Sequence, residues 1–270
     1  MRRSPIYVAA ALIAALLVAI DMVFALLRMR RRWREKRRTG IPGPITIQPD
    51  LPDDDFTWFF PPHDVHDRAA WDRYWHAQLE HGLTPPLFDM FCHDASLIQC
   101  LIERGTRTVL CAGSGVSQEP RALAAAGFEV TAMDLSPTAV HLAETWRFGP
   151  KELDRFCTAE QRAPGGSAEF VIGDILDRSV CPGPFDAIIE RRTLQLFPEH
   201  ERGAALDMLA SRLQPNGLFL SHCHDGGWKP PGRPVHQVER FFRDRGWFIT
   251  NSCDSPNHGR RTALLEMSTG

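Results

Sequence analysis

Short apolar runs alternate with helical segments along most of the chain, and this alternation restricts the possible folds more than any other feature. The expected strands cover residues 108–112, 128–133, 169–172, 185–190, 218–222, 247–253 and 262–267. The expected helices between them cover residues 117–126, 136–148, 199–213 and 235–245. Repeated strand–helix units form a parallel sheet that helices cover. We therefore expect an α/β fold with a seven-stranded, mostly parallel sheet, helices on both faces and a closing antiparallel pair.

Two further helices are expected before the first strand. Trp71, Tyr74 and Trp75 recur at helical spacing within residues 67–82, which predicts an amphipathic helix with an aromatic face. A second helix is expected over residues 87–103. Residues 149–168 have the composition of an inserted loop.

The N-terminal segment Ile6–Leu27 is apolar over 22 residues, with Asp21 as its single charge. A helix of this length spans about 33 Å at about 1.5 Å per residue, enough for a hydrocarbon core of about 30 Å. A cleaved signal peptide is the alternative. The run is long for such a peptide and ends in arginines instead of small residues, which favours an uncleaved transmembrane anchor.

A basic block follows this segment. Eight of the eleven residues from Arg28 to Arg38 are Arg or Lys, so the rest of the chain, with its net charge of -2 overall, is acidic on balance. Such a block is typical of a juxtamembrane segment and argues against nucleic-acid binding, which needs charge spread over a folded face. The positive-inside rule places everything after Arg28 in the cytoplasm. We expect a single-pass membrane protein with an anchor over residues 1–39, a Pro- and Gly-rich linker over 40–66 and a cytoplasmic domain over 67–270.

Cysteine and histidine usage bears on redox state and metals. Seven cysteines are scattered without CxxC spacing, which favours reduced thiols over a disulfide framework. His222-Cys-His-Asp225 carries side chains that bind metals, but no second cluster lies at ligand spacing, so we expect no metal site.

A glycine-containing turn follows the first expected strand in Val109-Leu-Cys-Ala-Gly-Ser-Gly-Val-Ser117. Gly113 and Gly115 would let the backbone approach a ligand that a Cβ would exclude, beside the N–H groups of the next helix. Asp134 ends the second strand, where a carboxylate accepts ribose hydroxyls in Rossmann-like nucleotide sites. An ordinary helix-capping Asp is the alternative.

The third and fourth strands end in further candidates, and the ends of parallel strands meet at one edge of the sheet. In Gly173-Asp174-Ile175, the carboxylate could accept an adenine amino group with Ile175 against the ring; a turn-capping Asp is the alternative. Phe185-Asp186-Ala187 leads to the charged Glu190-Arg191-Arg192, whose alternative is a solvated loop.

In this order the segments VLCAGSG, VTAMDLSP, FVIGDI, FDAIIER and LQPNGLFL resemble the motifs of class I S-adenosylmethionine (SAM)-dependent methyltransferases over residues 105–267. The sequence departs from that family at Cys111, where an acidic residue is common, and at Ser117, where a third glycine is common. The resemblance implies a Rossmann-like methyltransferase domain with SAM as its cofactor. The cofactor-binding residues it implies are Cys111, Gly113, Gly115, Asp134, Leu135, Asp174, Ile175 and Glu190.

A narrower likeness links Trp71-x-x-x-Trp75 and FDAIIERRTLQLFPEHER to the thiopurine methyltransferase-type group, which methylates small thiols, selenium compounds or halides. This likeness implies that Trp71 and Trp75 line the substrate site; packing of their helix onto the domain is the alternative. Arg191 would then orient the substrate, and Glu190 and Arg191 are the catalytic candidates.

The expected activity is methyl transfer from SAM to a small-molecule acceptor, namely a thiol, selenium compound, halide or lipophilic metabolite. A thiol or selenol needs no strong base, whereas a phenol or amine would need one, with Glu190 or the pair His222 and His224 as candidates. One alternative is a non-catalytic, SAM-binding-like scaffold at the membrane. Another is a nicotinamide-dependent oxidoreductase, against which Gly173-Asp174 and the Phe185-Asp186-Ala187 motif argue.

Overall fold

The computed structural model describes residues 62–80, 95–146, 153, 157–224, 235–255 and 262–269. The chain divides into two compact units, residues 1–55 and 56–270. The predicted transmembrane segment Ile6–Leu27, the basic block and most of the predicted linker lie outside the described residues. In the described part of the chain, no helix is long and apolar enough to cross a membrane.

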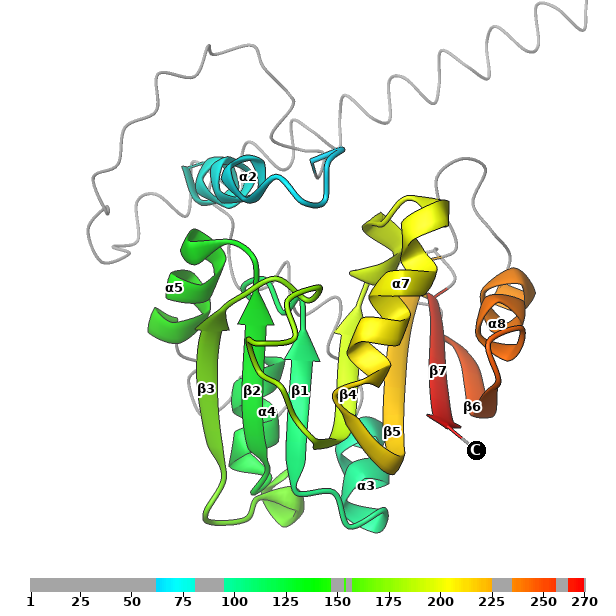
Figure 1. Cartoon of the computed structure of the whole chain (residues 1–270). Helices are drawn as coiled ribbons and strands as arrows, with labels where there is room; N and C mark the ends of the chain where they lie inside the picture. Colours follow the sequence, from blue (N-terminus) through cyan, green and yellow to red (C-terminus); the bar gives the residue numbers. More distant parts are fainter. Residues whose placement is uncertain are drawn as a thin grey trace, which may run out of the picture. The chain divides into compact units, whose positions relative to one another are not determined.

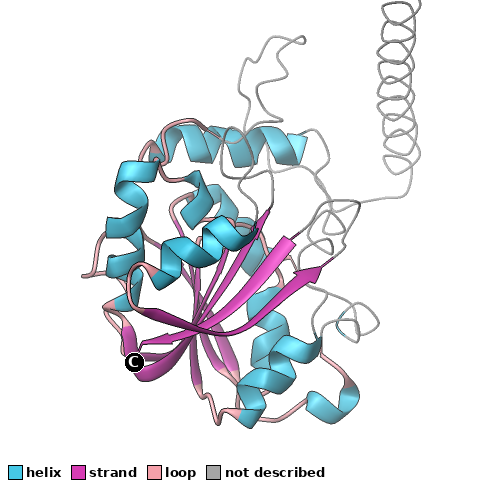
Figure 2. Ribbon diagram, turned by 90° about the vertical axis from the view of Figure 1, so that its right-hand side faces the viewer, coloured by secondary structure: helices cyan, strands magenta, loops and turns pink. Residues whose placement is uncertain are grey.

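Seven strands form one twisted sheet in the order β3-β2-β1-β4-β5-β7-β6 (Figures 1 and 2). The strands are β1 (Thr108–Ala112), β2 (Glu129–Asp134), β3 (Ser167–Ile172), β4 (Phe185–Arg191), β5 (Leu213–His224), β6 (Trp247–Ser255) and β7 (Thr262–Thr269). Neighbours from β3 to β5 pair in parallel, whereas β7 pairs antiparallel with both β5 and β6. The predicted α/β fold is confirmed, and the strand order reverses between β1 and β4, where such sheets bind ligands.

The helices lie close to their predicted positions, except that the first part of the helix predicted over 87–103 lies outside the described residues. They are α2 (Arg68–Glu80), α3 (Ala95–Glu103), α4 (Glu119–Ala125), α5 (Pro137–Thr145), α7 (Glu199–Ala210), α8 (Val235–Arg243) and the 3-10 helices η3 (Ala159–Gln161) and η4 (Leu194–Leu196). Helix α5 begins as predicted, because the Ser136 Oγ accepts a hydrogen bond from the Ala139 N–H at 3.2 Å and Pro137 occupies the first helical position. Helix α4 begins two residues later than predicted, after the Ser117 Oγ has accepted a hydrogen bond from the Glu119 N–H.

Alternating side chains of the strands supply two separate hydrophobic cores. Leu110 and Ala112 of β1 pack with residues of α7 and α8, such as Leu206 and Phe242. Val109 and Cys111, which point to the other face, pack with residues of α3 and α4. Both faces of the central strands are therefore apolar, as expected for a parallel sheet between two helical layers.

The two faces are not covered to the same extent. Residues 173–184, between β3 and β4, contain no helix and cross the face of the sheet that α7 and α8 leave open (Figure 1). The guanidinium of the fully buried Arg212 donates to the carbonyl oxygens of Ile175 and Asp177, both at 2.7 Å, and of Cys181 at 3.1 Å. Burial lowers the pKa of Arg212, but these carbonyl groups compensate its charge. One side chain thus holds a loop in a place where a covering helix would otherwise lie.

Candidate active site

The glycine turn after β1 and the carboxylate at the end of β2 meet at the carboxyl edge of the sheet. Gly113 and Gly115 have φ angles of 62° and 55°, in the left-handed region that favours glycine. The Gly115 N–H donates to Asp134 Oδ2 at 2.7 Å, and the Ser136 N–H donates to Oδ1 at 2.9 Å. The turn and the end of β2 therefore form one hydrogen-bonded unit.

Two side chains of the protein pack directly on this turn. A Cβ at Gly113 would lie 2.2 Å from Thr193 Oγ1, and a Cβ at Gly115 would lie 2.9 Å from Cζ2 of Trp75. The sequence predicted that these glycines admit a ligand. In the structure the space beside them is taken by Thr193, which follows β4, and by Trp75 of α2, so packing of these side chains is by itself a reason for glycine at both positions.

Asp134 keeps 9% of its surface exposed at this edge. Burial raises the pKa of its carboxyl group, and hydrogen bonds from the backbone N–H groups of Ser136 and Gly115 act in the opposite direction. An ionised carboxylate accepts about four hydrogen bonds. The two from Gly115 and Ser136 leave room for further donors such as the hydroxyls of a ribose.

The loop after β3 continues the same edge. The Gly173 N–H donates to the Asp134 carbonyl at 2.9 Å, and the half-buried Asp174 accepts the Leu176 N–H at 2.8 Å, so the predicted turn-capping alternative is realised in part. Ile175 is 6% exposed and packs into the core beside Met133, below the edge. Ile175 therefore supports the loop more than it lines an open site.

Two other predicted cofactor residues differ in placement. Leu135 is half-buried directly after Asp134, at the edge. Cys111 lies two residues before Gly113, where strand alternation turns its side chain toward α3 and α4, and it is 3% exposed between apolar neighbours such as Ile189. The structure brings Leu135 to the site and places the Cys111 side chain in the core.

The carboxylate of Glu190, at the end of β4, is 1% exposed and accepts several hydrogen bonds. Its Oε2 accepts the N–H groups of Thr193 at 2.9 Å and Leu194 at 3.2 Å, and its Oε1 accepts the Ser221 hydroxyl. Burial raises the pKa of Glu190, and these hydrogen bonds oppose the shift. The carboxylate thus fixes the start of η4 and, through it, the position of Thr193 against Gly113.

Arg191 points to the opposite face of β4 and binds other protein groups. Its guanidinium makes a two-pronged contact with the Glu119 carboxylate, with Nε at 2.7 Å from Oε2, and its Nη1 lies 3.0 Å from Nδ1 of His222. Two-pronged Arg–carboxylate pairs are strong and geometrically specific. Arg191 was predicted to orient a substrate; the structure shows that it joins β4 to the first turn of α4, which follows the glycine turn.

Helix α2 places its aromatic residues at the same edge, above β2 and β3 (Figure 1). Tyr74 makes edge contacts with Trp71 at 5.6 Å and with Trp75 at 5.2 Å between ring centroids. Trp75 packs against Val116 and the buried face of α5. Burial raises the pKa of Tyr74, and the nearby charge of Arg192 opposes this shift, which places Tyr74 toward the end of β4.

A family model described as "Methyltransferase domain" matches residues 110–221, which include the glycine turn, Asp134, Asp174 and the end of β4. The chain contains a class I SAM-dependent methyltransferase domain. It is therefore an enzyme that uses SAM as its cofactor. No curated protein sequence matches the chain.

Solved structures agree with the methyltransferase fold. The 1,6-didemethyltoxoflavin-N1-methyltransferase of Burkholderia thailandensis has a TM-score of 0.55 at 18% identity, covering 75% of this chain and 87% of its own. Magnesium protoporphyrin IX methyltransferase from Synechocystis PCC 6803, with bound SAM, has a TM-score of 0.50 at 19% identity, covering 77% and 86%. A TehB-like methyltransferase from Corynebacterium glutamicum has a TM-score of 0.50 at 18% identity, covering 77% and 100%. At these identities the likeness shows the fold.

The carboxyl edge of this methyltransferase domain fits an adenosyl group. The carboxylate of Asp134, which is 9% exposed, is hydrogen-bonded to the glycine turn at this edge, and an ionised carboxylate can accept further hydrogen bonds. Asp174 lies beside it on the next loop. We therefore expect the turn and Asp134 to hold the ribose, with Asp174 on the adenine side.

Several residues that shape the methyltransferase edge were not predicted from sequence. Thr193 packs on Gly113, Glu119 binds Arg191, and Asp72 of α2 accepts hydrogen bonds from α5. Glu119 and Asp72 could have been suspected, because one is an acidic residue in a first helical turn and the other lies between Trp71 and Trp75. No sequence pattern marks Thr193.

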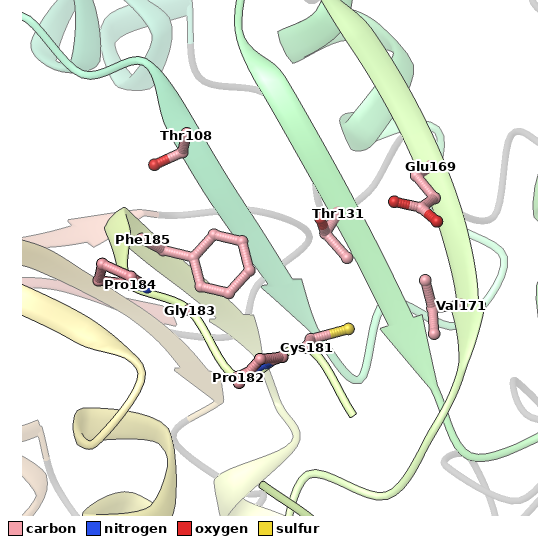
Figure 3. A pocket seen from close by; sticks show the side chains of 9 residues that line it. All are labelled: Thr108, Thr131, Glu169, Val171, Cys181, Pro182, Gly183, Pro184 and Phe185. Atoms are coloured by element: carbon pink, nitrogen blue, oxygen red, sulfur yellow. The ribbon is translucent and has the colours of Figure 1, made fainter. Parts of the chain in front are cut away.

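Other predicted features lie away from the methyltransferase edge. Asp186 accepts the N–H groups of Arg107 at 2.7 Å and Thr108 at 2.8 Å, so the motif around it joins the start of β4 to the start of β1. The pocket in Figure 3 lies on the open sheet face, between the starts of β1 and β4, the middle of β2 and β3 and the turn 181–184. Among the described residues no three metal-binding side chains come together.

Proposed function

We propose that this methyltransferase methylates a small-molecule acceptor, with a thiol or selenol as the preferred nucleophile, at the carboxyl edge of the sheet beside α2. The observation that carries the proposal is the contact of Trp75 with Gly115, because it places an aromatic helix directly over the cofactor turn. A roof of this kind encloses a small molecule and excludes water, and it leaves little room for a macromolecular substrate.

SAM supplies an electrophilic methyl group on a positively charged sulfur. The residues of the chain bind, orient and shield the reactants. Asp134 and the glycine turn fix the adenosyl end, and the faces of Trp71, Tyr74 and Trp75 provide an apolar wall that attracts positive charge. Such positioning is the main contribution a protein makes when the cofactor supplies the reactive group.

The contacts of the candidate bases Glu190 and His222 favour an acceptor that ionises without a protein base. Glu190 is buried and accepts hydrogen bonds from Ser221, Thr193 and Leu194, and His222 Nδ1 lies 3.0 Å from the Arg191 guanidinium. Both groups are committed to protein contacts. A thiol or selenol forms its anion near neutral pH and needs neither of them.

The narrower likeness to the thiopurine methyltransferase-type group points the same way. Members of this group act on small thiols, selenium compounds or halides. The likeness rests on Trp71-x-x-x-Trp75 and on the segment from Phe185 to Arg202. The position of α2 at the carboxyl edge supports a substrate-lining role for Trp71 and Trp75. Arg191 would act in this scheme by fixing the end of β4.

We also propose that Ile6–Leu27 anchors the chain in a membrane, with the methyltransferase domain in the cytoplasm. The apolar length of that segment and the basic block after it support this. An acceptor that partitions into the bilayer would then reach the enzyme at the surface. Carbonate extraction of membranes should retain the full chain and release a variant that lacks residues 1–39; release of the full chain would contradict the anchor.

The test of the acceptor class is transfer of the radiolabelled methyl group of SAM to a panel of thiols, selenols, halides, phenols, amines and quinols. We expect thiols and selenols to be methylated fastest, and Asp134→Ala to slow transfer to all of them when SAM is below saturation. Faster transfer to phenols or amines would contradict the proposed nucleophile. Binding of the product S-adenosylhomocysteine without transfer to any acceptor would support the scaffold alternative.

A further inference from the structure

Asp72 connects the aromatic helix to the helix that follows the cofactor carboxylate. Its Oδ1 accepts the Thr138 N–H at 2.8 Å and the Ser136 hydroxyl at 2.8 Å, both at the start of α5. Burial of Asp72 opposes its ionisation, but the hydrogen bonds from Thr138 and Ser136 outweigh it, and the pKa of the carboxyl group is lowered. An ionised side chain of α2 therefore caps α5, where a negative charge is favourable.

Ser136 continues this connection to the cofactor site. Its hydroxyl donates to Asp72, while its N–H donates to Asp134 Oδ1 at 2.9 Å. The other oxygen of Asp134 accepts the Gly115 N–H at 2.7 Å. A continuous chain of hydrogen bonds thus runs from α2 through Ser136 and Asp134 to the glycine turn, on which Trp75 of the same α2 packs.

The segment before α2 is attached on the other side of the edge. Val65 is buried in the core with Phe197, and Nε2 of His66 lies 2.6 Å from the Glu201 carboxylate of α7. The chain from residue 65 to residue 80 therefore crosses the edge of the sheet with one attachment at α7 and the other at α5. Between these attachments lie Trp71, Tyr74 and Trp75.

We propose that Asp72 is a positioning residue for cofactor binding, which acts through Ser136 and holds Trp75 of α2 against the glycine turn. This inference rests on the adenosyl group lying at that turn, as proposed above. Asp72 touches neither reactant, and its effect comes from the geometry it imposes on α2 and on the start of α5. A charged hydrogen bond contributes more than a neutral one, so its loss should be measurable.

The experiment measures the affinity for S-adenosylhomocysteine by calorimetry and the deuterium uptake of residues 68–80 by mass spectrometry, both in the full-length protein. Asp72→Ala should weaken S-adenosylhomocysteine binding by about tenfold, because the connection to α5 is lost. Exchange should become faster in α2 and stay unchanged in β1 and β4. Asp72→Asn keeps one acceptor oxygen and should restore part of the affinity.

Glu80→Gln is the matched control, since it changes an exposed carboxylate of the same helix to an amide. It should bind S-adenosylhomocysteine as the wild type does. Trp75→Ala should reproduce the loss seen in Asp72→Ala. The double variant should bind S-adenosylhomocysteine no more weakly than Trp75→Ala alone, because both changes remove the same packing of α2 on the glycine turn.

Wild-type affinity in Asp72→Ala, or tighter binding, would overturn the inference, as would additive losses in the double variant. A uniform rise in deuterium uptake across the sheet would also overturn it, because Asp72 would then serve overall stability alone. Absence of S-adenosylhomocysteine binding by folded wild-type protein would overturn the proposed function together with the inference. Wild-type binding that Asp72→Ala leaves intact would overturn the inference alone.

Discussion

Two strands of this sheet end in an acidic residue at the same edge, and the two carboxylates have different surroundings. Asp134, at the end of β2, accepts backbone N–H groups of the glycine turn and of Ser136 and keeps part of its surface exposed. Glu190, at the end of β4, is buried and accepts hydrogen bonds from Ser221 and from the start of η4. The same sequence signal accompanies the proposed ligand site in one region and an internal brace in the other.

The difference follows from what comes after each strand. Asp134 is followed by Leu135 and by Ser136, the N-cap of α5, whose N–H binds the carboxylate. After β4 the chain passes through Arg192, with a φ of 63°, into η4, which covers Glu190.

The largest expected effect is the loss of stability when the buried carboxylate of Glu190 is removed. Glu190→Ala leaves the Ser221 hydroxyl and two backbone N–H groups buried without their acceptor, so the free energy of unfolding should fall by about 4 kcal/mol. Urea unfolding measures this. Glu129→Ala, an exposed acidic residue on β2, is the control and should change stability by less than about 0.5 kcal/mol. A small change in Glu190→Ala would show that Glu190 is not a brace.

The second effect concerns the ligand site. Asp134→Ala should weaken S-adenosylhomocysteine binding by about thirtyfold, or about 2 kcal/mol, since the ribose hydroxyls lose a charged acceptor. Its stability should fall less than that of Glu190→Ala. Calorimetry and urea unfolding on the same samples separate the two quantities, and equal losses of stability in both variants would remove the contrast between the regions.

The two glycines of the turn test the contrast between Asp134 and Glu190 further, because Gly113 contacts the region that Glu190 holds and Gly115 contacts α2 beside Asp134. In Gly113→Ala the new Cβ meets Thr193, which Glu190 holds in place, whereas in Gly115→Ala it meets the far end of the Trp75 side chain. Each change also costs about 1 kcal/mol for a left-handed backbone. We expect Gly113→Ala to lower the unfolding free energy more, by about 2 kcal/mol, and Gly115→Ala to affect S-adenosylhomocysteine affinity more. The reverse order would contradict the assignment of the two regions.

The smallest effect is a pH dependence. Burial raises the pKa of Glu190, so between its ordinary pKa and the raised one the folded protein binds more protons than the unfolded chain. This contribution to stability therefore decreases as the pH rises through that window, with a slope of at most about 1.4 kcal/mol per pH unit. Relative to Glu190→Gln, the wild type should gain stability as the pH falls toward the ordinary pKa. Parallel stability curves for the two proteins would contradict the prediction.

Local sequence was sufficient for the fold and for part of the site. Apolar runs and helix caps placed most strands and helices within a few residues, although β5 begins five residues earlier than predicted. Asp134 was identified because it ends the second strand after the glycine turn, and Ser136 because it precedes Pro137 at the start of a helix. The role of Glu190 could not be identified in this way, since Ser221 is 31 residues away. The same holds for Arg191, whose partner Glu119 lies 72 residues earlier on another element. Contacts of this kind depend on which strands become neighbours.

The roles of single side chains on α2 show a second limit of prediction from sequence. Packing of this helix onto the domain was the alternative to a substrate-lining role, and Trp75 does pack against Val116 and α5. Helical spacing does not show that Asp72 binds the start of α5, because that contact depends on where the helix lies on the sheet. Nor does the strand pattern distinguish a Cys111 that faces the ligand from one that faces the core, until the following turn is known.

The way Arg212 holds the loop after β3 affects which residues of that loop can be substituted. Its guanidinium binds main-chain oxygens of Asp177 and Cys181, which every amino acid has, so this attachment does not itself depend on which side chains residues 177 and 181 carry. Leu176, Val180 and Cys181 pack against the core, whereas Asp177, Arg178 and Ser179 are exposed. For protein engineering, residues 177–179 are therefore the part of this loop in which substitutions should be tolerated best, with Arg212 left unchanged.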